Sequence, residues 1–293
     1  MGTITRSIAV VGVVVAALLA SGCAVRDPAP AGDAAAAVEL PDRDLLELMR
    51  VAAAIDSCLA AGADTPDTGV DITCRPRDVE VSVISPDAEI ARMPQRALGG
   101  AVAILADQST CTWYLPVDDD HVVSFSNGGP MITDCSPAEE AAAAFAERAL
   151  AGDETLLRPV AAERVTACDV VAAAGYTPVA DDDLIVSCGA QGQDWRLSRL
   201  SSISPGPAAD RDRDVRIDGT VVSVQDVGLG GCTTVWTGPD EAGVGRYPMG
   251  GLAVPGRCTP AIDELLAELV PAFVAVRPAD VDLSSYLIPA PAQ

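Results

Sequence analysis

The stretches CTWYLP (111–116) and CTTVWTGP (232–239) decide the fold, because each opens on the third cysteine of a set of four. The intervals between successive cysteines are 16, 37 and 24 residues in the first set and 20, 44 and 26 in the second. Similar intervals in the same order predict a tandem duplication of one module. The first set is Cys58, Cys74, Cys111 and Cys135, and the second is Cys168, Cys188, Cys232 and Cys258.

The residues around these cysteines repeat as well. Each set has a Thr-Pro pair between its first two cysteines, a stretch ending in Ile-Ser-Pro after the second, and a helix-like stretch opening at the fourth. We therefore expect two similar modules, residues 39–152 and 153–293. The paired stretches are Thr65-Pro66 and Thr177-Pro178, DVEVSVISP (78–86) and DWRLSRLSSISP (194–205), and CSPAEEAAAAF (135–145) and CTPAIDELLAEL (258–269).

Within each module the pattern predicts an α+β fold, with N- and C-terminal helices packed on a small antiparallel sheet. We expect Asp42 to cap a first helix that runs into Cys58. Residues 136–139 predict a capping box that opens an Ala-rich helix, and Thr259-Pro260 predicts the start of another. Valines that alternate with polar residues predict a strand at 79–83. The further strands predicted are 101–106, 112–117 and 121–125, followed by 184–187, 195–203, 220–227 and 233–236. Helices and strands do not alternate as in a doubly wound parallel sheet.

Two disulfides are expected in each module, because an even number of cysteines in an exported chain predicts a disulfide framework. Four cysteines allow three pairings, and the sequence does not choose among them. Proximity favours neighbours in sequence, and each such bond would stabilise the fold by roughly 3 kcal/mol on the chain-entropy model. The expected pairs are Cys58–Cys74, Cys111–Cys135, Cys168–Cys188 and Cys232–Cys258.

The first residues predict export and lipidation. Arg6 and the apolar run 8–19 have the form of a signal peptide, which we assign to residues 1–22. The small residues before Cys23 resemble the bacterial lipobox, whose cysteine carries diacylglycerol with fatty acids such as palmitate. Residues 23–38 would then be the lipidated cysteine and a tether, with no apolar periodicity and several Pro, Gly and Ala residues. This predicts a location at the extracytoplasmic face of the cell membrane.

The order of the cysteines behind a lipobox resembles the small actinobacterial lipoproteins grouped as DUF3558. In that order, one cysteine lies on an N-terminal helix, one beside a strand, one in a later strand and one at the start of a C-terminal helix. The resemblance implies a cell-envelope lipoprotein without known catalysis. It is carried by Cys168, Cys188, Cys232 and Cys258, and less clearly by Cys58, Cys74, Cys111 and Cys135.

Composition excludes several classes of function. All 19 basic residues are arginine, so Schiff-base chemistry and a P-loop lysine are absent. The 42 acidic residues give a formal net charge of -23, which would repel nucleic acid. His121 is the single histidine, which excludes zinc sites that need two. We expect no cofactor.

His121 and the acidic runs are the first candidate sites. His121 follows three aspartates and could act as a general base toward Ser124 or Ser126, but a solvated hairpin residue is the simpler interpretation. The acidic runs could supply oxygen ligands to Ca²⁺, but they lack EF-hand spacing and are interpreted as loops and turns. These runs are Asp118–Asp120, Asp181–Asp183, and Asp210, Asp212 and Asp214.

Glycines and tryptophans supply two further candidates. Gly228, Gly230 and Gly231 resemble part of a dinucleotide fingerprint, but they lead into a strand rather than a helix, which favours a bulge or tight turn. Trp113 and Trp236 follow their cysteines closely and are expected to pack on disulfide sulfur in each core, with ligand stacking as the alternative. We therefore assign no catalytic and no metal-binding residue.

The sequence predicts a membrane-anchored extracytoplasmic lipoprotein that binds a ligand or an envelope protein, and it favours a non-enzymatic role. The alternatives are an exported hydrolase that uses carboxylates, and a structural or sensory subunit that acts through protein contacts. The expected partners are the membrane, through the diacylglyceryl anchor, and an envelope protein or small molecule.

Overall fold

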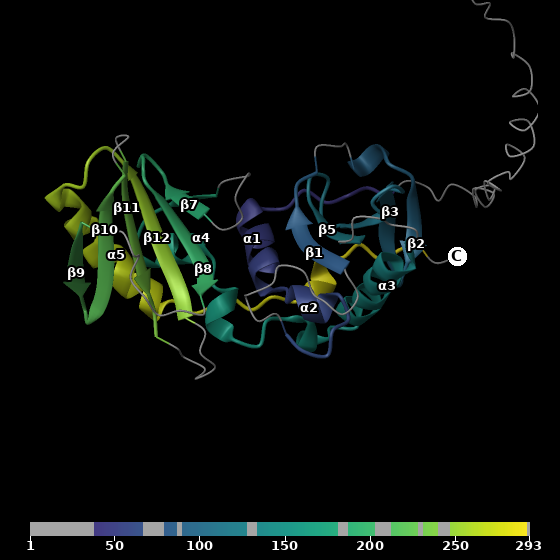
Figure 1. Cartoon of the computed structure of the whole chain (residues 1–293). Coiled ribbons are helices and arrows are strands. Elements are labelled where there is room, and N and C mark those ends of the chain that lie inside the picture. Colours follow the sequence, from purple (N-terminus) through teal and green to yellow (C-terminus); the bar gives the residue numbers. More distant parts are fainter. Residues whose placement is uncertain are drawn as a thin grey trace, which may run out of the picture. The chain divides into compact units, whose positions relative to one another are not determined.

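The computed structural model describes residues 38–66, 79–86, 90–127, 134–180, 187–202, 212–227, 231–239 and 247–291. This part of the chain has an α+β fold, with two antiparallel sheets and three disulfides (Figure 1). Both sheets belong to one compact unit, Ala35–Gln293. None of the described helices has the length and hydropathy needed to span a membrane.

The first sheet has five strands in the order β1-β5-β4-β3-β2, and all neighbours are antiparallel. Glycines at positive φ, Gly99 and Gly100, form the tight turn between β2 and β3. The strands are β1 (Val79–Ile84), β2 (Gln95–Leu98), β3 (Ala101–Asp107), β4 (Thr112–Pro116) and β5 (Val122–Asn127). The helices that accompany them are α1 (Leu45–Ala54), α2 (Ser57–Ala60) and α3 (Ser136–Leu150).

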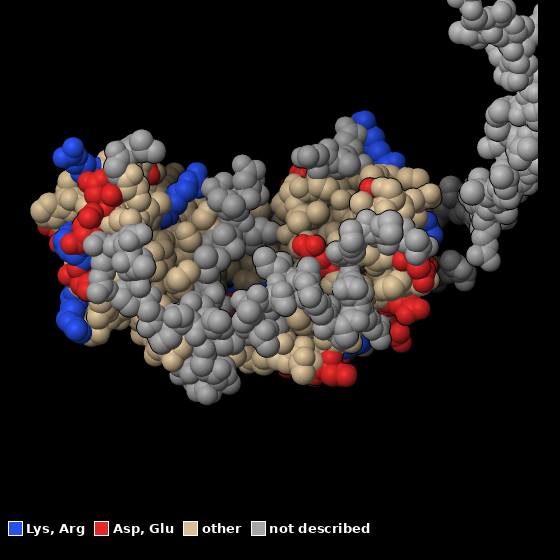
Figure 2. All heavy atoms as spheres, viewed as in Figure 1, with Lys and Arg blue, Asp and Glu red and all other residues tan. Residues whose placement is uncertain are grey.

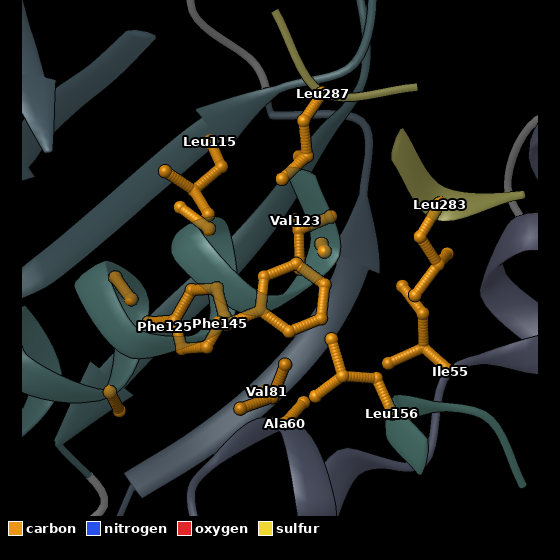
Figure 3. Close-up of a cluster of buried hydrophobic side chains, with 14 of the residues drawn as sticks. Ile55, Ala60, Val81, Leu115, Val123, Phe125, Phe145, Leu156, Leu283 and Leu287 are labelled. Carbon is orange, nitrogen blue, oxygen red and sulfur yellow. The ribbon is translucent and has the colours of Figure 1, made fainter. Parts of the chain in front are cut away.

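The core of the first sheet lies between the sheet and α3. Phe125 of β5 and Phe145 of α3 face each other with ring centroids 5.4 Å apart (Figure 3). Alanines on the buried face of α3 let the helix approach the strands closely. The same cluster contains Leu283 and Leu287, which come from the C-terminal end of the chain.

The second sheet has seven strands in the order β6-β7-β8-β12-β11-β10-β9, again all antiparallel. Its last five positions, β8-β12-β11-β10-β9, have the same connectivity as the whole first sheet. The strands are β6 (Pro178–Ala180), β7 (Ser187–Ala190), β8 (Arg196–Ser202), β9 (Arg213–Ile217), β10 (Thr220–Asp226), β11 (Gly231–Thr237) and β12 (Tyr247–Pro255). The helices are α4 (Ala167–Ala173) and α5 (Pro260–Ala275).

The second core is built around Trp236 of β11, which is 1% exposed. Its indole packs edge-on against Phe273 of α5, with ring centroids 5.5 Å apart. Gly250 of β12 lies directly under the indole, where a Cβ atom would collide with the ring. Arg199 is 9% exposed, stacks on the Phe273 ring and donates to the Phe273 carbonyl near the end of α5.

The N-terminal helix differs from the prediction. Its cap is Asp44, whose carboxylate accepts from the Leu46 N–H, rather than Asp42. The helix ends at Ala54 instead of reaching Cys58, because Asp56 is fully buried and caps a separate short helix, α2. The carboxylate of Asp56 accepts from the first backbone N–H groups of α2, which stabilises the break.

The capping box predicted at residues 136–139 is also wrong. Cys135 is the N-cap of α3 and makes no side-chain cap bond, since its sulfur is held in a disulfide. A capping box does occur at the start of α4, where Thr166 and Asp169 bond each other's backbone N–H. The helix predicted to start at Thr259-Pro260 is correctly placed, since Thr259 is the N-cap of α5.

Short 3-10 turns connect the elements. They are η1 (Ile90–Arg92), η2 (Glu154–Leu156), η3 (Ala161–Arg164) and η4 (Leu283–Ser285). The chain after α3 pairs back with the end of α1 through an isolated bridge between Ile55 and Leu157. Met49 of α1 points into the second core, while its neighbour Leu48 is part of the first.

Candidate functional site

Three disulfides join cysteines that are neighbours in sequence. They are Cys111–Cys135, Cys168–Cys188 and Cys232–Cys258. The first ties the turn before β4 to the start of α3, and the third ties β11 to the turn before α5. The second joins α4 to β7. Each bond therefore fixes a helix to the sheet that it covers.

The remaining cysteines are only partly described. Cys58 lies in α2 and is disulfide-bonded. Cys74, its expected partner, and Cys23, the expected lipidation site, both lie outside the described residues.

His121 lies beside Asp118 in the turn between β4 and β5. Its Nδ1 is 3.0 Å from Asp118 Oδ1, and the same carboxylate accepts from the backbone N–H groups of Asp120 and His121. Asp118 is 2% exposed, so the carboxylate is an internal support of the turn. The His121 side chain is 17% exposed, which is more buried than a solvated hairpin residue would be. The arrangement closes a turn and does not point to catalysis.

The described members of the acidic runs do not converge on one point. Asp212 accepts from the Asp226 N–H, and Asp214 accepts from the Ser223 hydroxyl, so both serve the β9–β10 hairpin. Asp181–Asp183 and Asp210 lie outside the described residues. Within the part of the chain that the structure describes, no group of three or more His, Cys, Asp or Glu residues is arranged to hold a metal ion.

Arg213 alternates with these acids but pairs with a carboxylate of another element. Arg213 binds the Asp263 carboxylate of α5 through both terminal nitrogens, at 3.0 and 2.6 Å. Figure 2 shows the same mixture on one face, where acidic side chains form small separate groups and lie among arginines over β9 and β10. The pair of Arg213 and Asp263 links α5 to the edge of the sheet. Because both signs of charge are interspersed, the described residues of this face form no patch of a single charge.

The glycine and tryptophan candidates have structural roles. Gly231 begins β11, while Gly228 and Gly230 lie outside the described residues. The Trp113 ring is 1% exposed and is covered by the Arg96 guanidinium, 4.6 Å from its centroid. Trp236 packs on Phe273. Both indoles are therefore buried, one against a cationic side chain and the other against an aromatic one. Neither ring has an exposed face on which a ligand could stack.

A cleft of about 370 Å³ lies between the chain after α3 and the chain after α5. Four carboxylates and one arginine line it, together with apolar side chains. The sequence analysis missed it, because its two walls are more than a hundred residues apart and neither contains a motif. Its lining residues are Gly152, Asp153, Glu154, Leu157, Arg164, Asp280, Val281, Asp282 and Leu283.

Asp153 is the most strongly held carboxylate of the cleft. It accepts from the Thr155 hydroxyl and backbone N–H and from Arg148 Nε. These bonds, led by the Thr155 hydroxyl, lower the pKa of Asp153 to about 2. Asp282 similarly accepts from the Ser284 N–H at the start of η4. Both carboxylates are thus held by hydrogen bonds on opposite walls.

Comparisons with protein-family models, with curated proteins and with solved structures give no significant match. Inference about function therefore rests on this chain alone.

Proposed function

We propose that the chain is an extracytoplasmic lipoprotein of the cell envelope, anchored by acyl chains on Cys23 and acting as a non-enzymatic binding module. The observation that carries the proposal is the set of disulfides that fix each described sheet to its helices. Disulfides persist in oxidising compartments outside the cytoplasm and are rare inside it. The apolar run 8–19 before Cys23 supports the same location.

The anchor is tested with a Cys23→Ser variant and a matched Ala24→Ser control. Cells are labelled with an alkyne analogue of palmitate, and the membrane, soluble and medium fractions are compared. The wild type and the control should be labelled and found with the membrane, because two acyl chains give stable anchoring. The Cys23→Ser chain should be unlabelled, and either released or left as an unprocessed precursor. A cleaved Cys23→Ser chain that stays in the membrane would contradict the anchor.

The tandem origin of the two modules is part of the proposal. It is supported by the shared strand order, in which β8-β12-β11-β10-β9 corresponds to β1-β5-β4-β3-β2. The disulfide that precedes α3 and the one that precedes α5 occupy matching positions in this order. Both observations agree with the resemblance to DUF3558 lipoproteins. We propose that this chain is a version with two such modules.

Binding is favoured over hydrolysis by the state of the Asp153 carboxylate. A hydrolase of the carboxylate type needs a general acid whose pKa is raised, so that it carries a proton near neutral pH. Asp153 is in the opposite situation, since its hydrogen bonds lower its pKa to about 2. A fixed anion is suited to holding a cationic group. We therefore propose that the ligand of the binding module carries a cationic group.

Spermidine is a suitable probe of the cleft. It should raise the thermal midpoint of the wild type in a saturable way, because a ligand that binds only the folded state stabilises it. Asp280→Asn should weaken this effect. Asp119→Asn removes an exposed carboxylate outside the cleft and should leave it unchanged. An unsaturable shift, or equal losses in both variants, would indicate general charge screening and contradict a cleft ligand.

A further inference from the structure

The C-terminal segment, residues 281–290, completes the core of the first sheet although it follows the last helix of the second. Leu283 and Leu287 are 6% and 4% exposed within the first core (Figure 3). Ile288 is 8% exposed. The first half of the chain therefore does not close its own core.

The segment also adds backbone pairing to β3. The β4 strand pairs with β3 only from Ile104 onward, so the first residues of β3 lack a partner on that side. The C-terminal segment takes this place: Val102 N–H donates to the Ile288 carbonyl and Ala290 N–H to the Gly100 carbonyl, both at 2.8 Å. An extended peptide that adds a strand to an open edge is a recurring mode of recognition.

Arg43 holds the segment from the other side. Its Nη2 donates to the Ser285 carbonyl at 2.7 Å, and its Nε donates to the Val117 carbonyl at 2.9 Å. Its guanidinium also lies 4.8 Å from the centroid of the Tyr286 ring. One arginine of the first half thus joins the segment to the β4–β5 turn.

These contacts have the properties of an exchangeable element. The contacts described here join the segment to residues of the first half, while residues 276–282 connect it to α5 without regular structure. A second copy of the chain carries an identical segment, which would make identical contacts. Exchange of an identical element between copies is a low-cost route to a dimer, because only the connection changes.

We propose that the site formed by Arg43, Gly100–Val102 and the first core accepts residues 281–290 from a second copy of this chain as well as from its own. The internal segment has an advantage through its effective concentration, on the order of 1 mM for a short connection. Exchange should therefore increase with chain concentration. Because the formal net charge is -23, added salt should promote it by screening repulsion between copies.

The test uses the full chain with the photocrosslinker p-benzoylphenylalanine in place of Tyr286, a conservative change at a half-buried aromatic position. Light and ¹⁵N-labelled chains are mixed, incubated and irradiated, and cross-links to the peptide that contains Arg43 are analysed by mass spectrometry. Mixed-isotope cross-links report exchange, whereas same-isotope cross-links contain the internal arrangement together with exchange between two chains of the same label. A second preparation with Leu287→Asp, which cannot enter the core, serves as the docking control.

As a fraction of all cross-links, mixed-isotope cross-links should rise about tenfold between 50 µM and 1 mM chain, because the second copy competes with an internal segment whose effective concentration is about 1 mM. They should be lost in the Leu287→Asp control. Same-isotope cross-links alone, at every concentration and after prolonged incubation, would show a permanent part of the core and overturn the proposal. Absence of any cross-link to the Arg43 peptide would overturn it too, because the segment would then not occupy the site at all.

Discussion

Gly250→Ala is a sharp test of the second core. Gly250 lies on β12 opposite Trp236, and a Cβ atom placed on it would be 2.6 Å from the indole Nε1 and closer still to two ring carbons. The indole is 1% exposed and cannot move outward without disturbing Phe273. The neighbouring Gly251 differs, since a Cβ there would be 3.7 Å from the Thr234 carbonyl oxygen, an ordinary contact.

The expected cost follows from three terms. Overpacking a filled core costs about 1–3 kcal/mol. Loss of the edge-on contact with Phe273 adds about 0.5–1.5 kcal/mol. Alanine in a strand gains about 0.5–1 kcal/mol over glycine, which offsets part of this. We expect Gly250→Ala to lower the free energy of unfolding by about 2 kcal/mol, within a range of about 0.5–4 kcal/mol, and the matched Gly251→Ala to be neutral or slightly stabilising.

Urea unfolding with the disulfides intact, followed by circular dichroism, measures the difference. The two variants should have equal denaturant slopes and clearly separated midpoints. Adding Trp236→Leu to Gly250→Ala should cost less than the sum of the two single changes, because the smaller side chain leaves room for the methyl group. Equal midpoints for Gly250→Ala and Gly251→Ala would refute the packing argument.

Three further outcomes are expected. Leu287→Ala should lower the free energy of unfolding by about 2–4 kcal/mol, because the side chain is buried in the first core; a loss below 0.5 kcal/mol in urea unfolding would contradict this. Asp169→Asn should cost about 2 kcal/mol, since the carboxylate both caps α4 and pairs with Arg50 at 2.8 Å; urea midpoints unchanged from the wild type would speak against it. Because the folded pKa of Asp153, about 2, lies below its ordinary 3.8, its contribution to stability is present above pH 4 and lost as the pH falls toward 2. Thr155→Val should reduce the change of the urea midpoint with pH in this window. An unaltered pH profile would contradict the role given to the hydrogen bond between Thr155 and Asp153.

Strands with strict alternation were predictable from the sequence. Val79, Val81 and Val83 alternate with polar residues and form β1. Short runs rich in apolar and β-branched residues place β3, β4, β10 and β11. The start of α5 was predictable too, since a proline at the first helical position is a local signal. These elements are decided by neighbours along the chain.

Other strands were missed because their reasons are not local. The sequence of β12 begins Tyr-Pro-Met-Gly-Gly and has the composition of a turn, yet Gly250 is required by the indole that lies over it. The edge strands β2 and β9 are short and rich in polar residues, and in β9 the apolar alternation is limited to Val215 and Ile217, which is too little to identify a strand. The strand β6 has three residues and was missed for its length.

The cleft could not be predicted for a related reason. Its walls come from residues 152–164 and 280–283, which meet only because the C-terminal segment returns to the first sheet. The last residues give little signal of this return: Leu283 and Leu287 have the i, i+4 spacing of a helix face, but the run is too short to predict a helix, and only the 3-10 turn η4 forms there. A long-range contact made by a few apolar residues becomes visible only in three dimensions.

The exchange of core residues between the two halves bears on the proposed duplication. A module that once folded alone must have buried its own core, since a small domain with an open core is barely stable. In this chain Leu283 and Leu287 complete the first core, and Met49 of α1 completes the second. If the chain arose by duplication, neither half now buries its core without residues of the other. The ion pair between Arg50 and Asp169 also joins α1 to α4. The conserved strand order would then reflect the ancestral module, whereas the crossing segments would be the later acquisition that made two modules one folding unit.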